Sequence, residues 1–384
     1  MPGQASLTRP NLTRRGLSRL LGAAALLGGR ARAEAGPYDV VLESNVRVAA
    51  RDGVKLATDV YRPARREQAE PRSVADHPEA SLMRLPLFAV VGALLAWTGA
   101  ARAAELLDAT PRTAVITAFA PEIVPLAAAL SDRHSYKVSG TEFITGTLEG
   151  KPVVLFLSGV SMVNAAMNTQ RVLDRFRITR IVFSGIAGGV DPSLDVGDVV
   201  APDQWGEYLE SVMAREDTPG HFASTYRDPV VGANFGMIFP KVTEVTGPGG
   251  KLEQRAWFPA DPGLIALARK VAPGVTLKRC SSPDRCLEKA PKVVVGGNGV
   301  SGQSFVDNAA FRTWAFTTFQ ARVLDMETAA VGQVAYANGV PFVGFRSLSD
   351  LAGGDPGRNQ AGVFFPLASD NSAAVVRAFV AALP

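Results

Sequence analysis

The chain has 384 residues, 47% of them hydrophobic, so it can bury a large core as one large domain or two small ones. Its net charge of +4 is unevenly distributed: residues 1–103 carry 15 Lys and Arg against 9 Asp and Glu, and the remainder carries 25 against 27. A basic balance of that origin gives no support to nucleic-acid binding, which needs a clustered basic face on the folded domain. We therefore expect no nucleic-acid partner.

Two export-type signals stand in the first part of the chain. Residues 14–33 join an arginine pair to an apolar stretch and a small-x-small cleavage sequence, as twin-arginine signals do. Residues 83–103 repeat this pattern from a second methionine. Both apolar stretches are shorter than the roughly 20 residues of a membrane span. We therefore predict a periplasmic or secreted protein without a stable membrane anchor, whose mature form begins near Ala104.

Residues 46–63, between these signals, alternate as two strands joined at Asp52-Gly53, which predicts a β-hairpin. The stretch resembles the opening hairpin of the cocaine-esterase and X-prolyl-peptidase hydrolases. No Gly-x-Ser-x-Gly nucleophile motif follows it. We interpret residues 1–82 as a gene fragment or a misplaced start, with a genuine leader as the alternative.

Cysteine and histidine are scarce beyond residue 103, where the chain contains only Cys280, Cys286, His134 and His221. This inventory is too thin for a typical zinc site, and we predict neither a metal nor a cofactor. In an exported protein, two cysteines six residues apart suggest a disulfide that pins a surface loop. Two free thiols are the alternative.

Strands and helices alternate from Thr113 onward. We expect strands at residues 113–119, 142–147, 152–157, 180–184 and 197–200, helices at 121–130 and from Ser161 as cap to Phe176, and a glycine-rich turn at 185–189. This rhythm predicts a single α/β domain over residues 104–384, in which helices flank a central mixed sheet.

The pattern loosens between residues 206 and 290, where glycine and proline are frequent. We interpret this stretch as an insertion or a binding lid. A final helix is expected near residues 370–383, with Asn371 and Ser372 at its start.

Carboxylates end the last two expected strands. Asp325-Met326-Glu327 closes one apolar strand, and Ser349-Asp350 closes a strand that begins at Pro341. The helix between them covers residues 328–338 and stops at glycine. Open α/β sheets place their chemistry at the carboxyl ends of strands, so Glu327 and Asp350 are expected at one sheet edge.

Several blocks of the sequence resemble a known family. Residues 185–200 are similar to the glycine turn and following strand of the nucleoside phosphorylase superfamily, and residues 325–330 and 346–350 resemble the methylthioadenosine/S-adenosylhomocysteine nucleosidase branch. Residues 299–308 are also similar to the plant bark and vegetative storage proteins of that superfamily. The resemblance covers about residues 112–384, and it implies a phosphorylase/nucleosidase-like domain and a homo-oligomer such as a dimer.

The resemblance also implies a site for a small-molecule nucleoside, whose N-glycosidic bond breaks through a ribosyl cation. Asp350 would protonate the departing purine at N7 with Ser349 orienting it, and Glu122 would activate the attacking water. Glu327 would hold the ribose 2′- and 3′-hydroxyls. The other implied nucleoside contacts are Met326, Phe305, Val306, Arg346, Phe119, Ala187 and Gly188.

Each of these residues also has an ordinary structural interpretation. A glutamate near a helix start, such as Glu122, is most often on the surface, a Ser-Asp pair after a strand is usually a turn or cap, and Phe305 alone suggests core. Four motifs in the expected order favour the functional interpretation.

The nucleophile is expected to be water rather than phosphate. The first turn, residues 118–122, has no basic residue, and Ile186 stands where the superfamily's phosphorylases carry a hydroxyl. The sequence therefore predicts an exported purine nucleosidase for a substrate such as methylthioadenosine or S-adenosylhomocysteine. A non-catalytic nucleoside-binding or storage-type protein and a phosphate-dependent phosphorylase are the alternatives.

Overall fold

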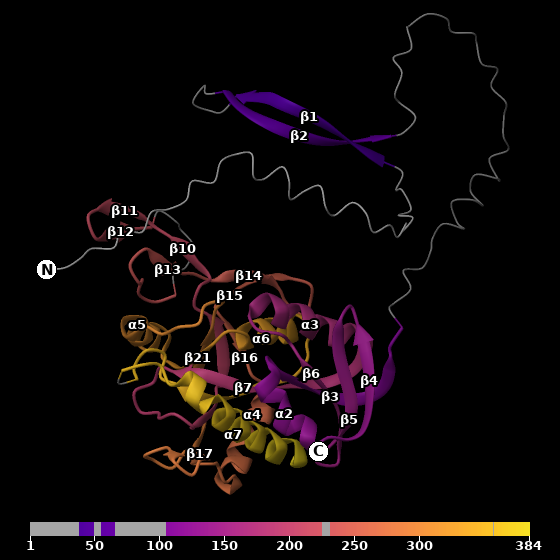
Figure 1. Ribbon diagram of the computed structural model, residues 1–384, viewed down its shortest axis with the longest axis vertical. Helices are drawn as coiled ribbons and strands as arrows, with labels where there is room; N and C mark the ends of the chain where they lie inside the picture. Colours follow the sequence, from indigo (N-terminus) through magenta and orange to yellow (C-terminus); the bar gives the residue numbers. More distant parts are fainter. Residues whose placement is uncertain (1–37, 50–54, 66–104, 225–230, 356) are drawn as a thin grey trace, which may run out of the picture. The chain divides into compact units, whose positions relative to one another are not determined.

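The computed structural model describes residues 38–49, 55–65, 105–224, 231–355 and 357–384 (Figure 1). The chain divides into two compact units, Met1–Trp97 and Thr98–Pro384. In the first, β1 (Tyr38–Ala49) and β2 (Lys55–Arg65) pair antiparallel, as the alternation predicted. Both export-type signals and the Asp-Gly turn lie outside the described residues.

A mixed sheet organises the second unit and confirms the predicted α/β class. Its central strand, β7, runs parallel to β3 and β22 and antiparallel to β21. Twelve strands of the described residues belong to it: β3 (Asp108–Thr117), β4 (Ser131–Val138), β5 (Thr141–Leu148), β6 (Lys151–Leu157), β7 (Phe176–Gly189), β8 (Val199–Ala201), β9 (Gln204–Glu207), β16 (Trp257–Pro259), β19 (Val293–Val295), β20 (Asn298–Ser301), β21 (Ala321–Asp325) and β22 (Phe342–Asp350).

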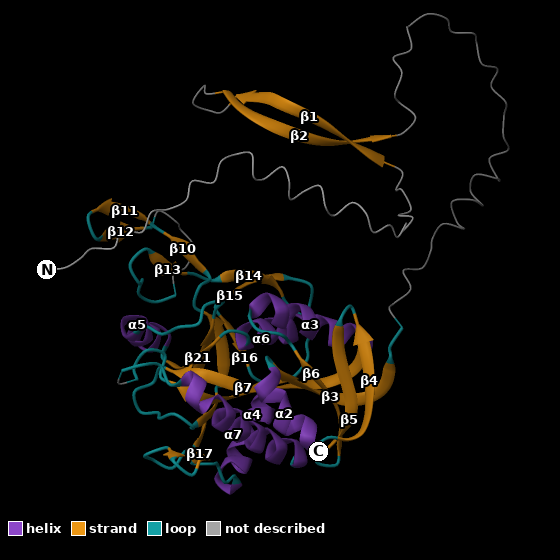
Figure 2. Cartoon of the chain, viewed as in Figure 1, coloured by secondary structure: helices purple, strands orange, loops and turns teal. Residues whose placement is uncertain are grey.

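Helices cover both faces of this sheet (Figures 1 and 2). Successive strand residues face opposite sides, so Ala114 and Ile116 join one core cluster while Val115 joins another. The first cluster packs under α3 (Met162–Arg175) and α6 (Thr328–Ala337), and the second under α2 (Ala120–Ala129), α4 (Pro262–Val271) and α7 (Ala361–Ala381). A third surrounds α5 (Ala309–Phe319).

The sequence suggested that residues 206–290 form an insertion or a binding lid, but the structure places parts of this stretch in the core of the domain. Strands β9 and β16 extend the main sheet, and α4 buries Leu264 and Ile265 in the core. Only short elements lie between and after them: β10 (Ser211–Met213), β11 (Arg215–Thr218), β12 (His221–Ala223), β13 (Ile238–Pro240), β14 (Thr243–Thr246), β15 (Leu252–Arg255), η2 (Ala272–Gly274), β17 (Cys280–Ser282) and β18 (Arg285–Cys286). Strands of two to four residues are too short to show a period in the sequence.

Helix α7 begins at Ala361, nine residues before the expected start. Asn371 and Ser372 are therefore not its cap but buried polar residues of its interior. Asn371 Oδ1 accepts the Lys278 N–H at 2.7 Å, and Ser372 Oγ accepts the Gly185 N–H at 3.1 Å. These bonds offset the cost of burying the two side chains.

Cys280 and Cys286 form a disulfide between the exposed strands β17 and β18. No helix in the part of the chain that the structure describes is long and apolar enough to cross a membrane.

Candidate active site

A cavity of about 210 Å³ opens where β3, β7, β21 and β22 end. It brings together all the predicted catalytic and nucleoside-contacting residues except Arg346: Phe119, Glu122, Ala187, Gly188, Phe305, Val306, Met326, Glu327, Ser349 and Asp350. Glu327 and Asp350 thus share one sheet edge, as the strand ends predicted. Val160 and Phe365 also line the cavity, although no sequence motif pointed to them, and so does Ile186, which stands where the superfamily's phosphorylases carry a hydroxyl.

Glu122 is buried, which excludes its interpretation as a surface helix residue. Pro121 occupies the first turn of α2, and the Glu122 side chain folds back over the end of β3. Its Oε2 accepts the N–H groups of Ala118 at 2.6 Å and Phe119 at 3.3 Å, and its Oε1 accepts that of Ile186 at 2.9 Å. Burial raises the pKa of Glu122, while Arg346 and these N–H groups oppose the rise.

The glycines of residues 185–189 form the end of β7 and not the expected turn. The register of β7 with β22 places Gly185 opposite Arg346 and Gly188 opposite Asp350. A Cβ at Gly185 would lie 2.1 Å from Arg346 Nη1 and 2.9 Å from Glu122 Oε1, and one at Gly188 would lie 3.2 Å from Asp350 Oδ1. The glycines therefore make room for functional side chains.

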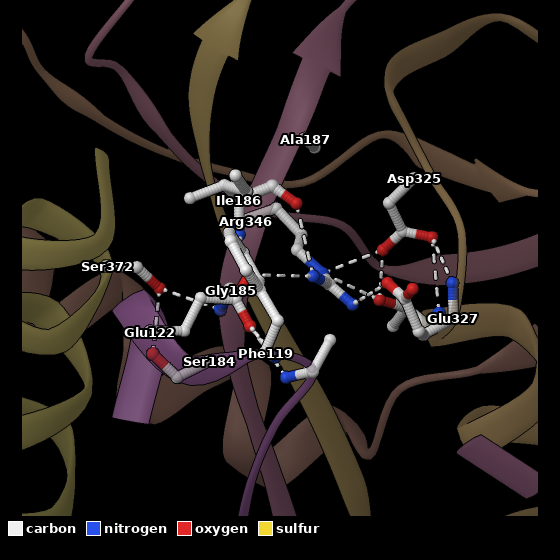
Figure 3. A network of polar contacts seen from close by, with 12 residues as sticks. Phe119, Glu122, Ser184, Gly185, Ile186, Ala187, Asp325, Glu327, Arg346 and Ser372 are labelled. Carbon is white, nitrogen blue, oxygen red and sulfur yellow. Dashed lines mark hydrogen bonds and ion pairs between the residues drawn. The ribbon is translucent and has the colours of Figure 1, made fainter. Parts of the chain in front are cut away.

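Arg346 is not among the described residues that line the cavity, and its predicted contact with the nucleoside stays a prediction. Figure 3 shows its side chain among the buried carboxylates. Its side chain is 1% exposed and stacks on the Phe183 ring at 4.1 Å. The guanidinium lies 2.7 Å from Asp325, 3.4 Å from Glu327 and 3.8 Å from Glu122. It therefore positions and partly neutralises the carboxylates of the site.

Glu327 follows β21 and precedes α6, where its Oε1 accepts the Ser161 N–H at 2.8 Å. Ser161 has a left-handed φ of 79° and makes no side-chain cap, so its expected capping role is wrong; the backbone N–H serves Glu327 instead. Burial raises the pKa of Glu327 to about 7, with Arg346 opposing the rise and Asp325 adding to it. Because few donors satisfy this carboxylate, it can accept further hydroxyl groups.

Asp350 ends β22 on the other side of the cavity. Its Oδ2 accepts the Ser349 hydroxyl at 2.8 Å, and its Oδ1 accepts the Ala352 N–H at 2.9 Å. Burial raises the pKa of Asp350, and hydrogen bonds from Ala352, Ser349 and Asn359 reduce the rise. This environment favours a protonated carboxyl that can act as an acid.

Apolar side chains form most of the remaining wall. Phe119 and Phe365 meet edge to face at 5.7 Å, and Val160 is a further apolar residue of the lining. Phe305 is 57% exposed within the lining, which argues against its interpretation as core. Phe365 lies before the helix start that the sequence predicted, so no sequence signal assigned it to the site.

The charged residues of the lining are all acidic: Glu122, Asp325, Glu327 and Asp350. Among the described residues, no group of three or more His, Cys, Asp and Glu side chains is arranged to hold a metal ion. A cavity of this charge repels anions and favours a ligand that develops positive charge.

Comparison with known proteins places this site in a family. The model of the Phosphorylase superfamily matches residues 112–381. The chain belongs to this superfamily. Within it, the 5′-methylthioadenosine/S-adenosylhomocysteine nucleosidase of Halalkalibacterium halodurans is 33% identical over 270 residues, covering 70% of this chain and 97% of the relative. The nucleosidase of Marinomonas sp. is 30% identical, covering 68% and 95%.

A solved structure agrees. The nucleosidase of Neisseria meningitidis, in complex with methylthio-immucillin-A, has a TM-score of 0.53 and 26% identity, covering 71% of this chain and 99% of that one. The nucleosidase branch predicted from the sequence is confirmed, and the chain is an N-ribosyl hydrolase.

Proposed function

We propose that this nucleosidase hydrolyses a purine nucleoside with an apolar 5′ substituent, such as methylthioadenosine, outside the cytoplasm. The observation that carries the proposal is the convergence of Glu122, Glu327 and Asp350 on one cavity. Breaking an N-glycosidic bond requires a proton for the base, a nucleophile for C1′ and a hold on the sugar. Each carboxyl is suited to one of these tasks.

Asp350 acts on the base. Burial raises the pKa of its carboxyl, which favours the protonated form, and Ser349 fixes its orientation. Proton transfer to purine N7 neutralises the charge that develops on the leaving base, so the bond to C1′ breaks more easily. A general acid of this kind is worth about 10²–10⁴ in rate.

Glu327 and Glu122 act on the sugar side. The ionised Glu327 accepts the two hydroxyls of the ribose cis-diol, one on each oxygen. Glu122 is fixed by three backbone N–H groups and accepts a proton from the attacking water. The negative charge of both carboxylates stabilises the ribosyl cation between them.

Water is the nucleophile in this proposal. A phosphate ion would need cationic groups, whereas the charged residues of the described lining are all carboxylates and Ile186 has no hydroxyl to offer. Arg346 is engaged by three carboxylates and buried beneath them. The phosphorylase alternative therefore finds no support in the charge of the cavity.

The apolar end of the cavity supports the choice of substrate. Phe119, Val160 and Phe365 offer a surface for a methylthio group and no partner for a phosphate. The relatives from Halalkalibacterium halodurans and Marinomonas sp. are named for methylthioadenosine and S-adenosylhomocysteine, which fits a 5′-thioether.

Export is supported by the two signal-like segments of the sequence and by the Cys280–Cys286 disulfide. Disulfides persist in oxidising compartments and are rare in the cytosol. Fractionation of cells that produce the full chain tests this: the proposal expects shortened protein in the periplasm or medium, and full-length protein confined to the cytosol would contradict it.

The activity is tested by incubating the full chain with methylthioadenosine, S-adenosylhomocysteine, adenosine and inosine, with and without phosphate, and measuring free base. We expect phosphate-independent release, fastest from methylthioadenosine. Release that depends on phosphate would establish a phosphorylase. Tight binding without release from any substrate would establish a nucleoside-binding protein, the alternative for which a water-activating Glu122 serves no purpose.

A further inference from the structure

One arginine serves three buried carboxylates in this site (Figure 3). The side chains of Asp325, Glu122 and Glu327 are at most 6% exposed, and Arg346 lies within 4 Å of each. If all three were ionised, the cluster would carry two uncompensated negative charges. A single positive charge therefore has to stabilise three carboxylates, and the distances from Arg346 to them are unequal.

Of the three carboxylates, Asp325 lies closest to the positive charge of Arg346. Arg346 Nε lies 2.7 Å from Asp325 Oδ2, whereas the distances to Glu327 and Glu122 are 3.4 and 3.8 Å. The Nε–H itself donates to Thr328 Oγ1 at 2.8 Å, and the Thr328 hydroxyl in turn donates to Asp325. Asp325 is itself held on every side: the hydroxyls of Ser301 and Thr328 donate to it, and the N–H groups of Glu327 and Thr328 lie 3.2 Å from Oδ1. A carboxylate with this many donors is fixed in position.

We propose that Asp325 is a positioning residue, which draws the Arg346 guanidinium toward itself and so keeps Glu122 and Glu327 available to water and to the ribose diol. The proposal rests on the nucleosidase function above. A carboxylate in a tight arginine pair is a weaker base, because the arginine stabilises its ionised form. By holding the arginine, Asp325 leaves the two reacting carboxylates basic while keeping them in reach of one stabilising charge.

The groups around Glu327 agree with this division. They are Glu122 from α2, Asp325 from β21, Arg346 from β22 and Tyr208 after β9. Burial and the neighbouring Asp325 raise the pKa of Tyr208 well above its usual value, so its phenol stays neutral and adds no charge. The charge of Glu327 is therefore governed by its burial, by Arg346 and by Asp325.

Asp325→Asn tests the proposal, because it keeps the size of the side chain and removes its charge. Arg346 is then expected to move toward Glu327 and Glu122, so both the lost charge and the moved charge lower the pKa of Glu327. We expect the acid limb of the pH profile of kcat/KM to shift downward by about one pH unit. At pH 8, where wild-type Glu327 is ionised, kcat is expected to fall roughly tenfold, because the carboxylates stabilise the ribosyl cation less.

Ser301→Ala is the matched control. It removes a hydrogen bond to the same Asp325 carboxylate but changes no charge, so we expect the acid limb to stay in place. Asp325→Glu restores the charge and is expected to return the limb to its wild-type position. A folded Asp325→Asn enzyme with an unshifted limb would overturn the proposal, and so would an equal shift in Ser301→Ala.

A measurement on the wild-type full chain keeps the proposal testable if Asp325→Asn does not fold. An under-neutralised Glu327 holds roughly half a proton at pH 7 and must release it to accept the diol. Calorimetric titration with a C-nucleoside analogue of adenosine, in buffers of different ionisation enthalpy, should show this release. The 2′,3′-dideoxy analogue should show none, and a diol ligand bound without proton release would contradict the proposal.

These outcomes are distinct from failure of the nucleosidase function, which would appear as wild-type protein that releases no base from any nucleoside.

Discussion

The buried carboxyls to which we assign the sugar and the one to which we assign the base differ in their charged neighbours. On the sugar side, Glu122 and Glu327 lie near the Arg346 guanidinium and accept backbone N–H groups. On the base side, Asp350 has donors only from neutral groups. Burial raises the pKa of all three carboxyls, but only the sugar side has a cation that counteracts it.

This difference separates bases from acid. A carboxyl with a cation nearby can ionise in the interior, whereas one without a cation holds its proton. Environments that push the pKa values of neighbouring carboxyls apart assign their catalytic tasks. We therefore propose that Arg346, which lies within 4 Å of Glu122 and Glu327 and makes no described ion pair with Asp350, decides which carboxyl donates a proton and which accept one.

The largest effect is expected from Asp350→Asn, which removes the acid and leaves the sugar side intact. We expect kcat to fall about 10²- to 10⁴-fold, measured as free base from methylthioadenosine. Affinity for a C-nucleoside analogue should change little, because Glu327 still holds the ribose. Wild-type turnover in this variant would show that Asp350 is not the general acid, and the proposed difference between the carboxyls would then be wrong.

Gly185→Ala tests the sugar side through packing. The new Cβ would overlap Arg346 Nη1, at 2.1 Å, and lie close to Glu122 Oε1. Both side chains are confined in the interior, so we expect a loss of about 1–3 kcal/mol in the free energy of unfolding, measured by urea denaturation. We also expect kcat to fall with it, because the arginine is displaced from the carboxylates.

Gly188→Ala is the matched substitution on the base side, where the new Cβ would meet Asp350 Oδ1 at 3.2 Å and Ala352 Cβ at 3.0 Å. These contacts are tight without overlap, so its loss of stability should be smaller. If both alanine variants were equally stable, the space argument for Gly185 would be wrong.

The sequence predicts those parts of the site that depend on motifs or periodicity within one segment, but not those that depend on contacts between segments far apart in the chain. The strand-ending motifs placed Glu327 and Asp350 at one sheet edge, and periodicity placed α2 and α6 within about one residue of their ends. The ion pairs of Arg346 with the carboxylates could not be predicted, because they follow from the β7–β22 register, which pairs Arg346 with Gly185 far away in the chain. The Ser161 N–H to Glu327 bond is equally non-local, so no local pattern announces it.

The pH dependence of activity tests the difference between Glu327 and Asp350, with a smaller expected effect than the substitutions above. Glu327 must be ionised, so activity should rise with pH through about 7. Burial also raises the pKa of Glu122, which must be ionised as well and contributes to the same limb. Asp350 must be protonated, so activity should fall as pH rises through its own raised pKa. We expect a bell-shaped dependence of kcat/KM on pH, which reports these groups in the free enzyme. A profile with only one limb would show that activity does not require both an ionised Glu327 and a protonated Asp350.

Ser349→Ala is expected to have the smallest effect, and it acts on one limb alone. The Ser349 hydroxyl donates to Asp350 Oδ2 at 2.8 Å and so favours the ionised carboxylate. Its removal raises the pKa of Asp350 further, which moves the basic limb to higher pH, while the lost orientation lowers kcat by roughly threefold to tenfold. The acid limb should not move, because Ser349 makes no contact with Glu327 or Glu122 among the described hydrogen bonds. Movement of both limbs would mean that the two ends of the cavity titrate as one unit, and that the position of Arg346 does not separate them.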